Sequence, residues 1–334
     1  MKVSILDQSP VSSGMSERDA LLTSIRLAQH AEKLGYERFW IAEHHDLFGL
    51  ACSNPSVMLS AIGAQTNTIK IGAGAVLLPY YQPFHVAETY NLLATLYPGR
   101  IDLGLGRAPG GSAEVSLALS DNYLAEVRKF PEKIDDLLRF FRSDFPEDHP
   151  YSKISPTPIP EVEPAVWLLG TSDKSATLAA EKGLHYAFGD FMTDQDGPAI
   201  VQRYRKGMLE RHPNKDPYVI VAINVICAPT TEEAEALARS QWLWKIRQEA
   251  FGEETHIPSV EEAKHYKVSA AEQEKIEQMK RQMIVGNPDE VRTGLLDLHE
   301  QYQADEYMIV TVVHEEAAKL RSYELVKEIA VDLD

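Results

Sequence analysis

Short apolar runs rich in β-branched residues alternate with amphipathic stretches along almost the whole chain, and this alternation most constrains the fold. Strands that alternate with helices pair in parallel and bury both faces of their sheet. Eight such runs occur, over residues 3–6, 39–42, 69–78, 101–105, 165–169, 185–188, 218–227 and 307–313. Eight strands, each followed by a helix, predict an α/β protein with the architecture of a (β/α)8 TIM barrel.

Two stretches are too long for ordinary connections in a barrel. Residues 143–164 are polar and rich in proline. Residues 250–285 belong to a long region whose pattern predicts helices over 231–250 and 270–284. We therefore expect insertions after strands 4 and 7. Residues 1–334 should form a single domain, with the insertion at about 250–285 acting as a lid.

The charge balance restricts the class of partner. A formal net charge of -17 disfavours nucleic acid and anionic membranes, and it favours a small-molecule substrate. Only two cysteines occur, Cys52 and Cys227, so the sequence indicates no disulfide framework and suits a reducing cytoplasm. The chain starts directly with a strand, and no window is apolar over the length of a membrane span.

Ionisable side chains end the second strand, where the apolar run 39–42 is followed by Glu43, His44 and His45. The carboxyl ends of barrel strands carry the active site. Adjacent residues in an extended segment point to opposite sides, so the two imidazoles form a poor metal clamp, and we expect no metal site. One histidine should contact substrate or cofactor, and the other should make a structural hydrogen bond.

A glycine-rich segment follows the fourth strand at residues 104–111. It is not a dinucleotide fingerprint, because Pro109 stands where the third glycine would fall and no acidic residue follows at the required distance. Glycines permit close approach of a ligand, and Arg107 offers a forked cationic donor for phosphate. The alternative is a glycine-rich turn that carries a surface arginine.

Hydroxyl groups cluster where the fifth strand meets its helix, at Thr171, Ser172 and Ser175. A helix N-terminus attracts anions, so these residues suit phosphate binding. N-capping by Ser172 is the structural alternative. Glu88 lies in the helix after the third strand among apolar residues, where it needs a partner if buried. Otherwise, it belongs to a solvated helix face.

The order and spacing of several segments resemble bacterial luciferase and, more broadly, the luciferase-like flavin-dependent monooxygenases. They are residues 40–45 with 54–55, 72–79, 91–93, 99–100, 167–180, 286–288 and 305–306. The segment 106–110 is similar to the non-luminous single-gene relatives. Where the light-producing subunit of luciferase has a reactive cysteine, this chain has Gly106. The resemblance therefore favours a monooxygenase without light emission.

The resemblance implies a (β/α)8 barrel, a homodimer, and FMN that a separate flavin reductase supplies in reduced form. The reaction would use oxygen and a small organic substrate such as an aldehyde or ketone. Two alternatives share the fold: an oxidoreductase that depends on a deazaflavin, and a non-catalytic flavin-binding protein.

The resemblance also implies roles for individual residues. His44 matches the catalytic imidazole beside the flavin. Gly74 and Ala75 match a non-prolyl cis peptide beneath the flavin ring. Three positions, Arg107, Ser172 and Ser175, match contacts to the FMN phosphate, and Thr171 belongs to the same cofactor-binding segment. His45 and Glu88 resemble a pair that meets across the dimer interface.

Overall fold

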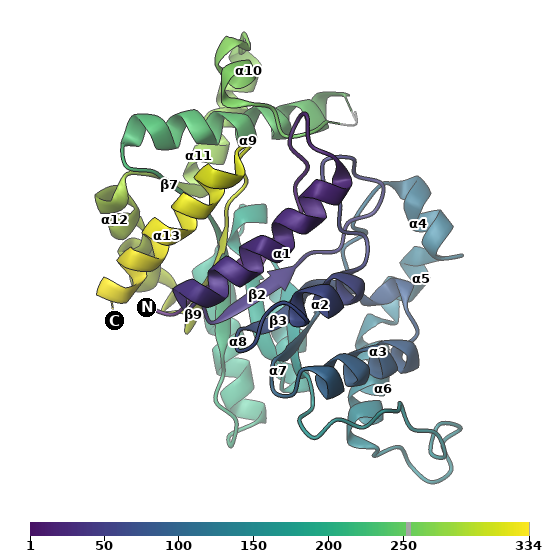
Figure 1. Ribbon diagram of the computed structural model, residues 1–334. Helices are drawn as coiled ribbons and strands as arrows, with labels where there is room; N and C mark the ends of the chain where they lie inside the picture. Colours follow the sequence, from purple (N-terminus) through teal and green to yellow (C-terminus); the bar gives the residue numbers. More distant parts are fainter. Residues whose placement is uncertain (252–254, 334) are drawn as a thin grey trace.

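A closed barrel of eight parallel strands forms the centre of the computed structural model, which describes residues 1–251 and 255–333 (Figure 1). Around the barrel the order is β1 (Val3–Asp7), β2 (Arg38–Ile41), β3 (Lys70–Leu77), β4 (Ile101–Gly106), β5 (Ala165–Gly170), β6 (His185–Gly189), β7 (Val219–Cys227) and β9 (Glu306–Val310). Pairing of Val3 with Tyr307 joins β9 to β1 and closes the ring. The predicted TIM barrel is confirmed.

Helices surround the strands. They are α1 (Glu17–Leu34), α2 (Pro55–Gly63), α3 (Pro83–Leu96), α6 (Phe130–Arg142), α7 (Asp173–Lys182), α8 (Gly197–Arg211), α12 (Pro288–Tyr302) and α13 (Glu316–Asp332). Local signals fix their ends. Asn54 caps α2 by accepting a hydrogen bond from the Val57 amide, ahead of Pro55 in the first turn. Gly35 ends α1 with a positive φ of 78°.

The sequence did not predict several elements, among them the short helix over Val260–His265. A short strand, β8 (Met283–Gly286), pairs with β7 outside the barrel, so the predicted helix over 270–284 is wrong at its end. Helices α4 (Ala113–Leu119) and α5 (Tyr123–Arg128) lie between β4 and α6. Residues 143–164 contain neither helix nor strand, as expected for an irregular insertion. Single turns of 3₁₀ helix follow β3 (Leu78–Tyr80) and β6 (Asp190–Met192).

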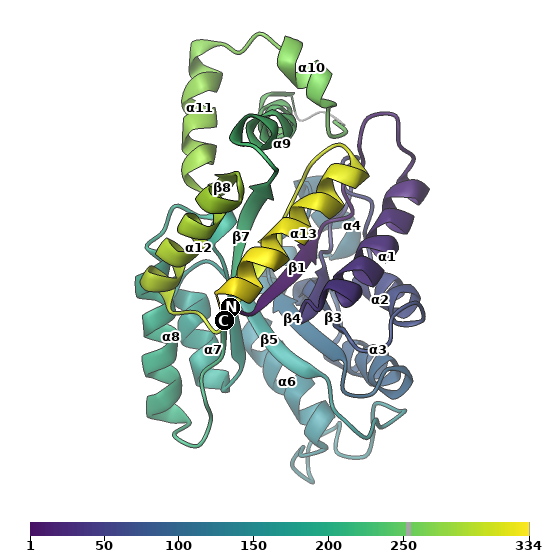
Figure 2. The ribbon, with the colours of Figure 1, turned by 60° about the vertical axis from the view of Figure 1, so that its left-hand side comes forward.

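Three helices follow β7 and gather at the end of the molecule toward which β7 points (Figure 2). They are α9 (Thr231–Phe251), α10 (Val260–His265) and α11 (Ala270–Arg281). Gln278 of α11 and Gln282, the residue directly after this helix, donate hydrogen bonds to the Asp194 carboxylate, at 3.1 and 2.6 Å. The predicted insertion over 250–285 includes residues 252–254, which lie outside the described residues. Within the described ranges, no helix combines the length and apolarity needed to cross a membrane.

A buried ionic cluster fills the barrel at the amino-terminal ends of the strands. The Arg38 guanidinium donates to Asp102 and Glu306, in both cases at 2.7 Å. The indole N–H groups of Trp40 and Trp167 also donate to Asp102, at 2.9 and 3.2 Å. Burial of these charges is tolerated because each is paired and hydrogen-bonded. Because this cluster fills the amino-terminal end of the barrel, space for a ligand remains at the carboxyl ends of the strands.

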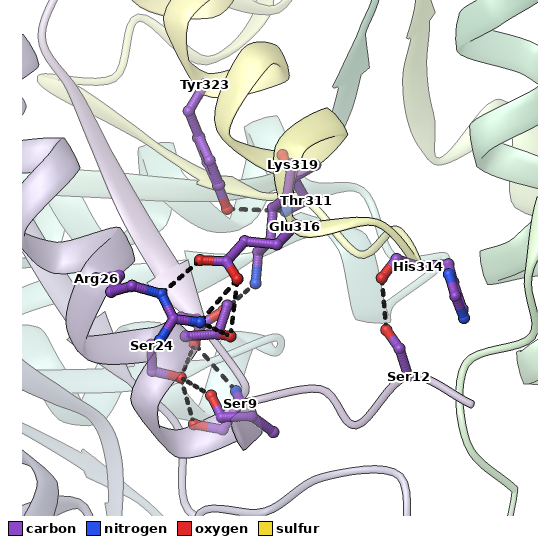
Figure 3. Close-up of polar contacts among 12 residues, drawn as sticks. Ser9, Ser12, Ser24, Arg26, Thr311, His314, Glu316, Lys319 and Tyr323 are labelled. Carbon is purple, nitrogen blue, oxygen red and sulfur yellow. Dashed lines mark hydrogen bonds and ion pairs between the residues drawn. The ribbon is translucent and has the colours of Figure 1, made fainter. Parts of the chain in front are cut away.

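The first and last helices are fastened to each other and to β1 (Figure 3). Nε and Nη2 of Arg26 on α1 both donate to Glu316 on α13, at 2.7 Å. Lys319 of α13 forms a buried ion pair with Asp7 at the end of β1, at 2.5 Å. Ser24 donates to the same carboxylate at 2.6 Å. These contacts hold α1 beside α13, where the ring of helices closes (Figures 1 and 2).

Candidate functional site

A cavity of about 390 Å³ opens at the carboxyl ends of the strands, and each of the eight barrel strands contributes to its wall. The residues predicted for catalysis and cofactor binding all line it: His44, Gly74, Ala75, Arg107, Thr171, Ser172 and Ser175. They come from four separate strand ends, so the fold brings together what the sequence keeps apart. A cavity of this size is typical of small-molecule sites.

The His44 side chain borders the cavity and is largely shielded from solvent. Its backbone N–H donates to the Cys52 carbonyl at 3.0 Å, which fixes the loop after β2. Its Nδ1 is buried and has no hydrogen-bond partner among the described residues. Burial, and to a smaller extent the neighbouring His45, lowers the pKa of His44 to about 4. The imidazole is therefore neutral near pH 7 and can accept a hydrogen bond or a proton.

Glu43 and His45 form a separate polar group at the edge of the cavity. The Glu43 carboxylate, 3% exposed, accepts hydrogen bonds from the Leu77 amide at 3.0 Å, the Tyr81 hydroxyl at 2.7 Å and His45 Nε2 at 2.9 Å. Burial and the Glu43 charge raise the pKa of the Tyr81 phenol. His45 thus makes a structural hydrogen bond within the chain. Glu88, its expected partner across a dimer, lies partly buried on α3.

Arg107 lies at the cavity mouth directly after β4, with an exposed side chain. Its carbonyl oxygen accepts a hydrogen bond from the Tyr123 hydroxyl at 2.7 Å, so α5 holds the backbone while the guanidinium stays available. Among the described residues, no carboxylate pairs with this guanidinium. An unpaired fork of donors at a cavity mouth suits an anionic group such as phosphate.

Ser172 and Ser175 form a capping box at the start of α7. Ser172 Oγ accepts from the Ser175 amide at 3.4 Å, and Ser175 Oγ donates to the Ser172 carbonyl at 2.7 Å. N-capping, the structural alternative, is therefore present. It leaves the positive end of the helix dipole beside Thr171 at the cavity wall, so phosphate binding here stays a prediction.

The floor of the cavity consists of backbone and small side chains. The Gly74–Ala75 peptide bond is cis, as the resemblance implies. A Cβ atom on Gly74 would lie 2.9 Å from Leu6 Cδ1, and one on Gly106 would lie 2.9 Å from Ala75 Cβ. Both positions therefore exclude a side chain unless neighbours move. The cysteine that luciferase carries at the position of Gly106 would not fit this wall unchanged.

The cavity fits a flat aromatic cofactor with an anionic tail. Glycine and alanine give a smooth floor, the Arg107 guanidinium and the α7 N-terminus offer two anion-binding elements, and the His44 imidazole borders the same cavity. FMN has this shape and charge distribution. Among residues 1–251 and 255–333, no three His, Cys, Asp or Glu side chains gather as a metal ion would require.

A groove of about 730 Å³ runs between α2 and α3 on the outside of the barrel. We call it the α2–α3 groove and define it by its mainly apolar lining: Val57, Ala61, Ala64, Val86, Leu92, Leu93 and Leu96. Leu92 and Leu96 are 50% and 55% exposed. Glu43 borders both this groove and the cavity, so only a thin wall separates them.

Sequence reasoning named Glu43 but assigned it no role, although three hydrogen bonds make it the anchor of the β3 end. The available signal was a carboxylate placed immediately after a fully buried strand. The Arg38–Asp102–Glu306 cluster was missed altogether, because charged residues at strand starts look like ordinary surface positions.

Comparison with known proteins agrees with this geometry. The family model described as luciferase-like monooxygenase matches residues 1–304. The chain is 42% identical to the protein YceB of Bacillus subtilis (strain 168), over 98% of each chain. It is 36% identical to N-acetyl-S-alkylcysteine monooxygenase of the same organism, again over 98% of each. The crystal structure of apo-MsnO8 superimposes with a TM-score of 0.89 at 33% identity, covering 99% of this chain and 98% of that one.

Proposed function

This chain belongs to the family of luciferase-like monooxygenases, and from that premise we propose that it is an FMN-dependent monooxygenase acting on a small organic substrate. The observation that carries the proposal is the convergence of His44, the Gly74–Ala75 floor, Arg107 and the start of α7 on one cavity. Reduced FMN, when bound, supplies the electrons that reduce oxygen, so that one oxygen atom enters the substrate and the other leaves as water.

The chain's own residues orient the cofactor and manage protons. Arg107 and the α7 N-terminus with Thr171, Ser172 and Ser175 would hold the phosphate, while Gly74 and Ala75 would support the ring. His44, neutral because its pKa is about 4, would accept a proton or hydrogen bond through its imidazole beside the ring. The remaining wall is mostly apolar and excludes water.

The proposed substrates are aldehydes, ketones and similar small molecules. One relative acts, by its name, on N-acetyl-S-alkylcysteines, which adds thioethers to the compounds worth testing. We further propose that a separate reductase delivers the reduced FMN, as the resemblance implies. The buried free thiols of Cys52 and Cys227 support a cytoplasmic location.

A homodimer formed through the α2–α3 groove completes the proposal. Exposed leucines along this groove would be buried against a second copy, and Glu88 of α3 would approach the partner's His45. In a symmetric dimer this contact occurs twice. Helices α2 and α3 would therefore supply both the apolar surface and the polar contact of the dimer.

Cofactor titration separates the proposal from its alternatives. We expect the protein to bind FMN, and to consume oxygen when a flavin reductase, NADH and a substrate such as decanal or a thioether are added. Tight binding of a deazaflavin without affinity for FMN would instead identify the hydride-transferring alternative. Flavin binding without substrate-dependent oxygen uptake across aldehydes, ketones and thioethers would indicate a non-catalytic protein.

Arg107→Ala tests the phosphate contact directly. We expect FMN affinity to fall by about 1.5–3 kcal/mol, the scale of hydrogen bonds to a charged group. Riboflavin, which lacks the phosphate, should bind the variant and the wild type equally in fluorescence titrations. An unchanged FMN affinity would place the phosphate elsewhere.

A further inference from the structure

Three carboxamide side chains, Gln8, Asn224 and Gln241, belong to elements near the carboxyl ends of the barrel strands. Gln8 lines the cavity, whereas Asn224 and Gln241 lie outside its lining. None of them makes a side-chain hydrogen bond to the residues that the structure describes. Asn224 and Gln241 are each 2% exposed, and their side-chain oxygens are buried without a partner. Buried amides normally find partners, so an unpaired group beside a cavity points to a ligand.

The alternation of β7 aims Asn224 into the barrel. Side chains two residues apart in a strand share a face, and Ala222 of the same strand lines the cavity. The neighbouring strand repeats the pattern: Ala222 pairs with Met308, another lining residue, and Asn224 pairs with Val310. Asn224 therefore faces inward at the next inward-facing position after Ala222, nearer to the barrel mouth.

Gln8 and Gln241 approach the same mouth from other elements. Gln8 lines the cavity and follows the inward-facing Leu6 of β1 by two residues. Gln241 lies on α9, one turn before Trp244. Trp244 packs in one apolar cluster with inward-facing residues of the barrel: Leu6, Val310 and Val312. Gln8, just after β1, and Asn224 of β7 thus flank the apolar strip formed by Val310 at the end of β9 and Val312 beyond it.

We propose that these three residues recognise an uncharged carboxamide group, such as an N-acyl amide, on the organic substrate. A carboxamide side chain offers both a donor and an acceptor, which matches a ligand group that needs both. A charged ligand would require an opposite charge nearby. The inward positions around the strip, Gln8, Asn224, Val310 and Val312, carry none. The inference rests on the proposed function and adds the class of substrate.

Three isosteric probes test this recognition: N-hexylacetamide, hexyl acetate and 2-nonanone. The ester and the ketone lack the N–H donor of the amide but keep its length. Isothermal titration calorimetry gives the dissociation constants for the apo-protein and for the FMN-saturated protein, without turnover. We expect Asn224→Leu to weaken N-hexylacetamide about tenfold relative to 2-nonanone. Gln8→Met should shift the same ratio in the same direction.

Asn214→Leu, at an exposed position before β7, is the matched control and should leave the affinity ratio unchanged. Equal weakening of amide and ketone by Asn224→Leu would mean that Asn224 only shapes the cavity, and would overturn the proposal. An unchanged ratio in both variants would overturn it too. The calorimetry measures binding and not turnover, so its outcome does not depend on oxygen uptake. An absence of oxygen uptake would contradict the proposed monooxygenase activity but not the recognition of the amide.

Discussion

Two neighbouring histidines have different partners because their side chains leave the chain on opposite sides. His45 Nε2 donates to the Glu43 carboxylate, whereas the Nδ1 of His44 is left without a partner in the described structure. A buried, unpaired imidazole has a lowered pKa and is available for chemistry. The division of roles that the sequence left open is thus resolved in geometry for His45, while the catalytic role of His44 stays a prediction.

Replacing His44 should affect chemistry more than binding. For His44→Ala we expect turnover to fall by roughly 10²-fold or more, the scale of lost acid–base catalysis, with FMN affinity close to that of the wild type. Oxygen uptake and flavin fluorescence measure the two quantities. His265→Ala, at an exposed position on α10, serves as the control. Unchanged turnover in the His44 variant would refute its role.

The lowered pKa of His44 also predicts a dependence of stability on pH. The folded-state pKa of about 4 lies below the ordinary value of 6.5, so the folded state binds fewer protons between these values. The contribution to stability is complete above pH 6.5 and is lost as the pH falls toward 4. Denaturant unfolding at pH 7 and 5 should show a loss of about 1–3 kcal/mol in the wild type that His44→Gln lacks. Parallel losses in both proteins would contradict this assignment.

The candidate site was predictable from the sequence where function follows a strand end or a local motif. His44, Arg107 and the hydroxyl cluster each follow a recognisable strand, and all line the cavity. Glu43 was harder, because its partner Leu77 is 34 residues away and only the pairing of β2 with β3 brings them together. Tertiary partners of this kind leave no local pattern.

At the level of elements, the Asp194 carboxylate is one of the connections between the insertion after β7 and the cavity wall. Asp194 accepts hydrogen bonds from Gln278 of α11 and from Gln282 directly after it. It follows the turn that carries Phe191 and Met192, both of which line the cavity. We propose that this contact holds the predicted lid closed over the site.

Asp194→Ala should loosen α11. Removing both hydrogen bonds should raise amide hydrogen exchange in residues 270–282 by about tenfold or more. The Michaelis constant for the organic substrate should rise, since a loosened lid retains substrate less well. Asp216→Ala, in the exposed turn before β7, is the control. Equal exchange rates in the wild type and the Asp194 variant would contradict a lid held by this carboxylate.

Strand β8, one of the elements that the sequence did not predict, shows where a local pattern fails to indicate structure. Residues 283–286 continue an amphipathic helical stretch in sequence, yet they pair with the exposed edge of β7. Only β7, which is nine residues long, extends far enough beyond the barrel to offer this edge. The eight barrel strands were predictable because each is a distinct buried run between helices.

At the scale of the whole molecule, the α2–α3 groove is an apolar surface on the outside of the barrel that the fold leaves exposed. It is larger than the cavity, and its exposed lining is mainly apolar. An exposed apolar surface of this kind marks an interaction site. Assembly of two copies through the groove would bury the leucines of α3.

Leu92→Glu should convert the proposed homodimer to monomers, because a carboxylate would be buried without a partner. Leu209→Glu on α8 is a closely matched control, since Leu209 is 51% exposed and Leu92 is 50% exposed. Sedimentation velocity at micromolar concentration distinguishes the two states. A monomeric wild type, or a Leu92 variant that remains dimeric, would contradict assembly through this groove.

The fastening of α1 to α13 has a consequence for synthesis on the ribosome. Asp7 lies 312 residues before its ionic partner Lys319, so it leaves the ribosome long before that partner is synthesised. Until then, β1 has only one of its two neighbouring strands, because β9 is also absent. Late pairing of distant segments leaves strand edges open during synthesis. The nascent chain therefore carries an unclosed sheet from the synthesis of β1 until that of β9, and the edge of β1 stays open to non-native pairing over that interval.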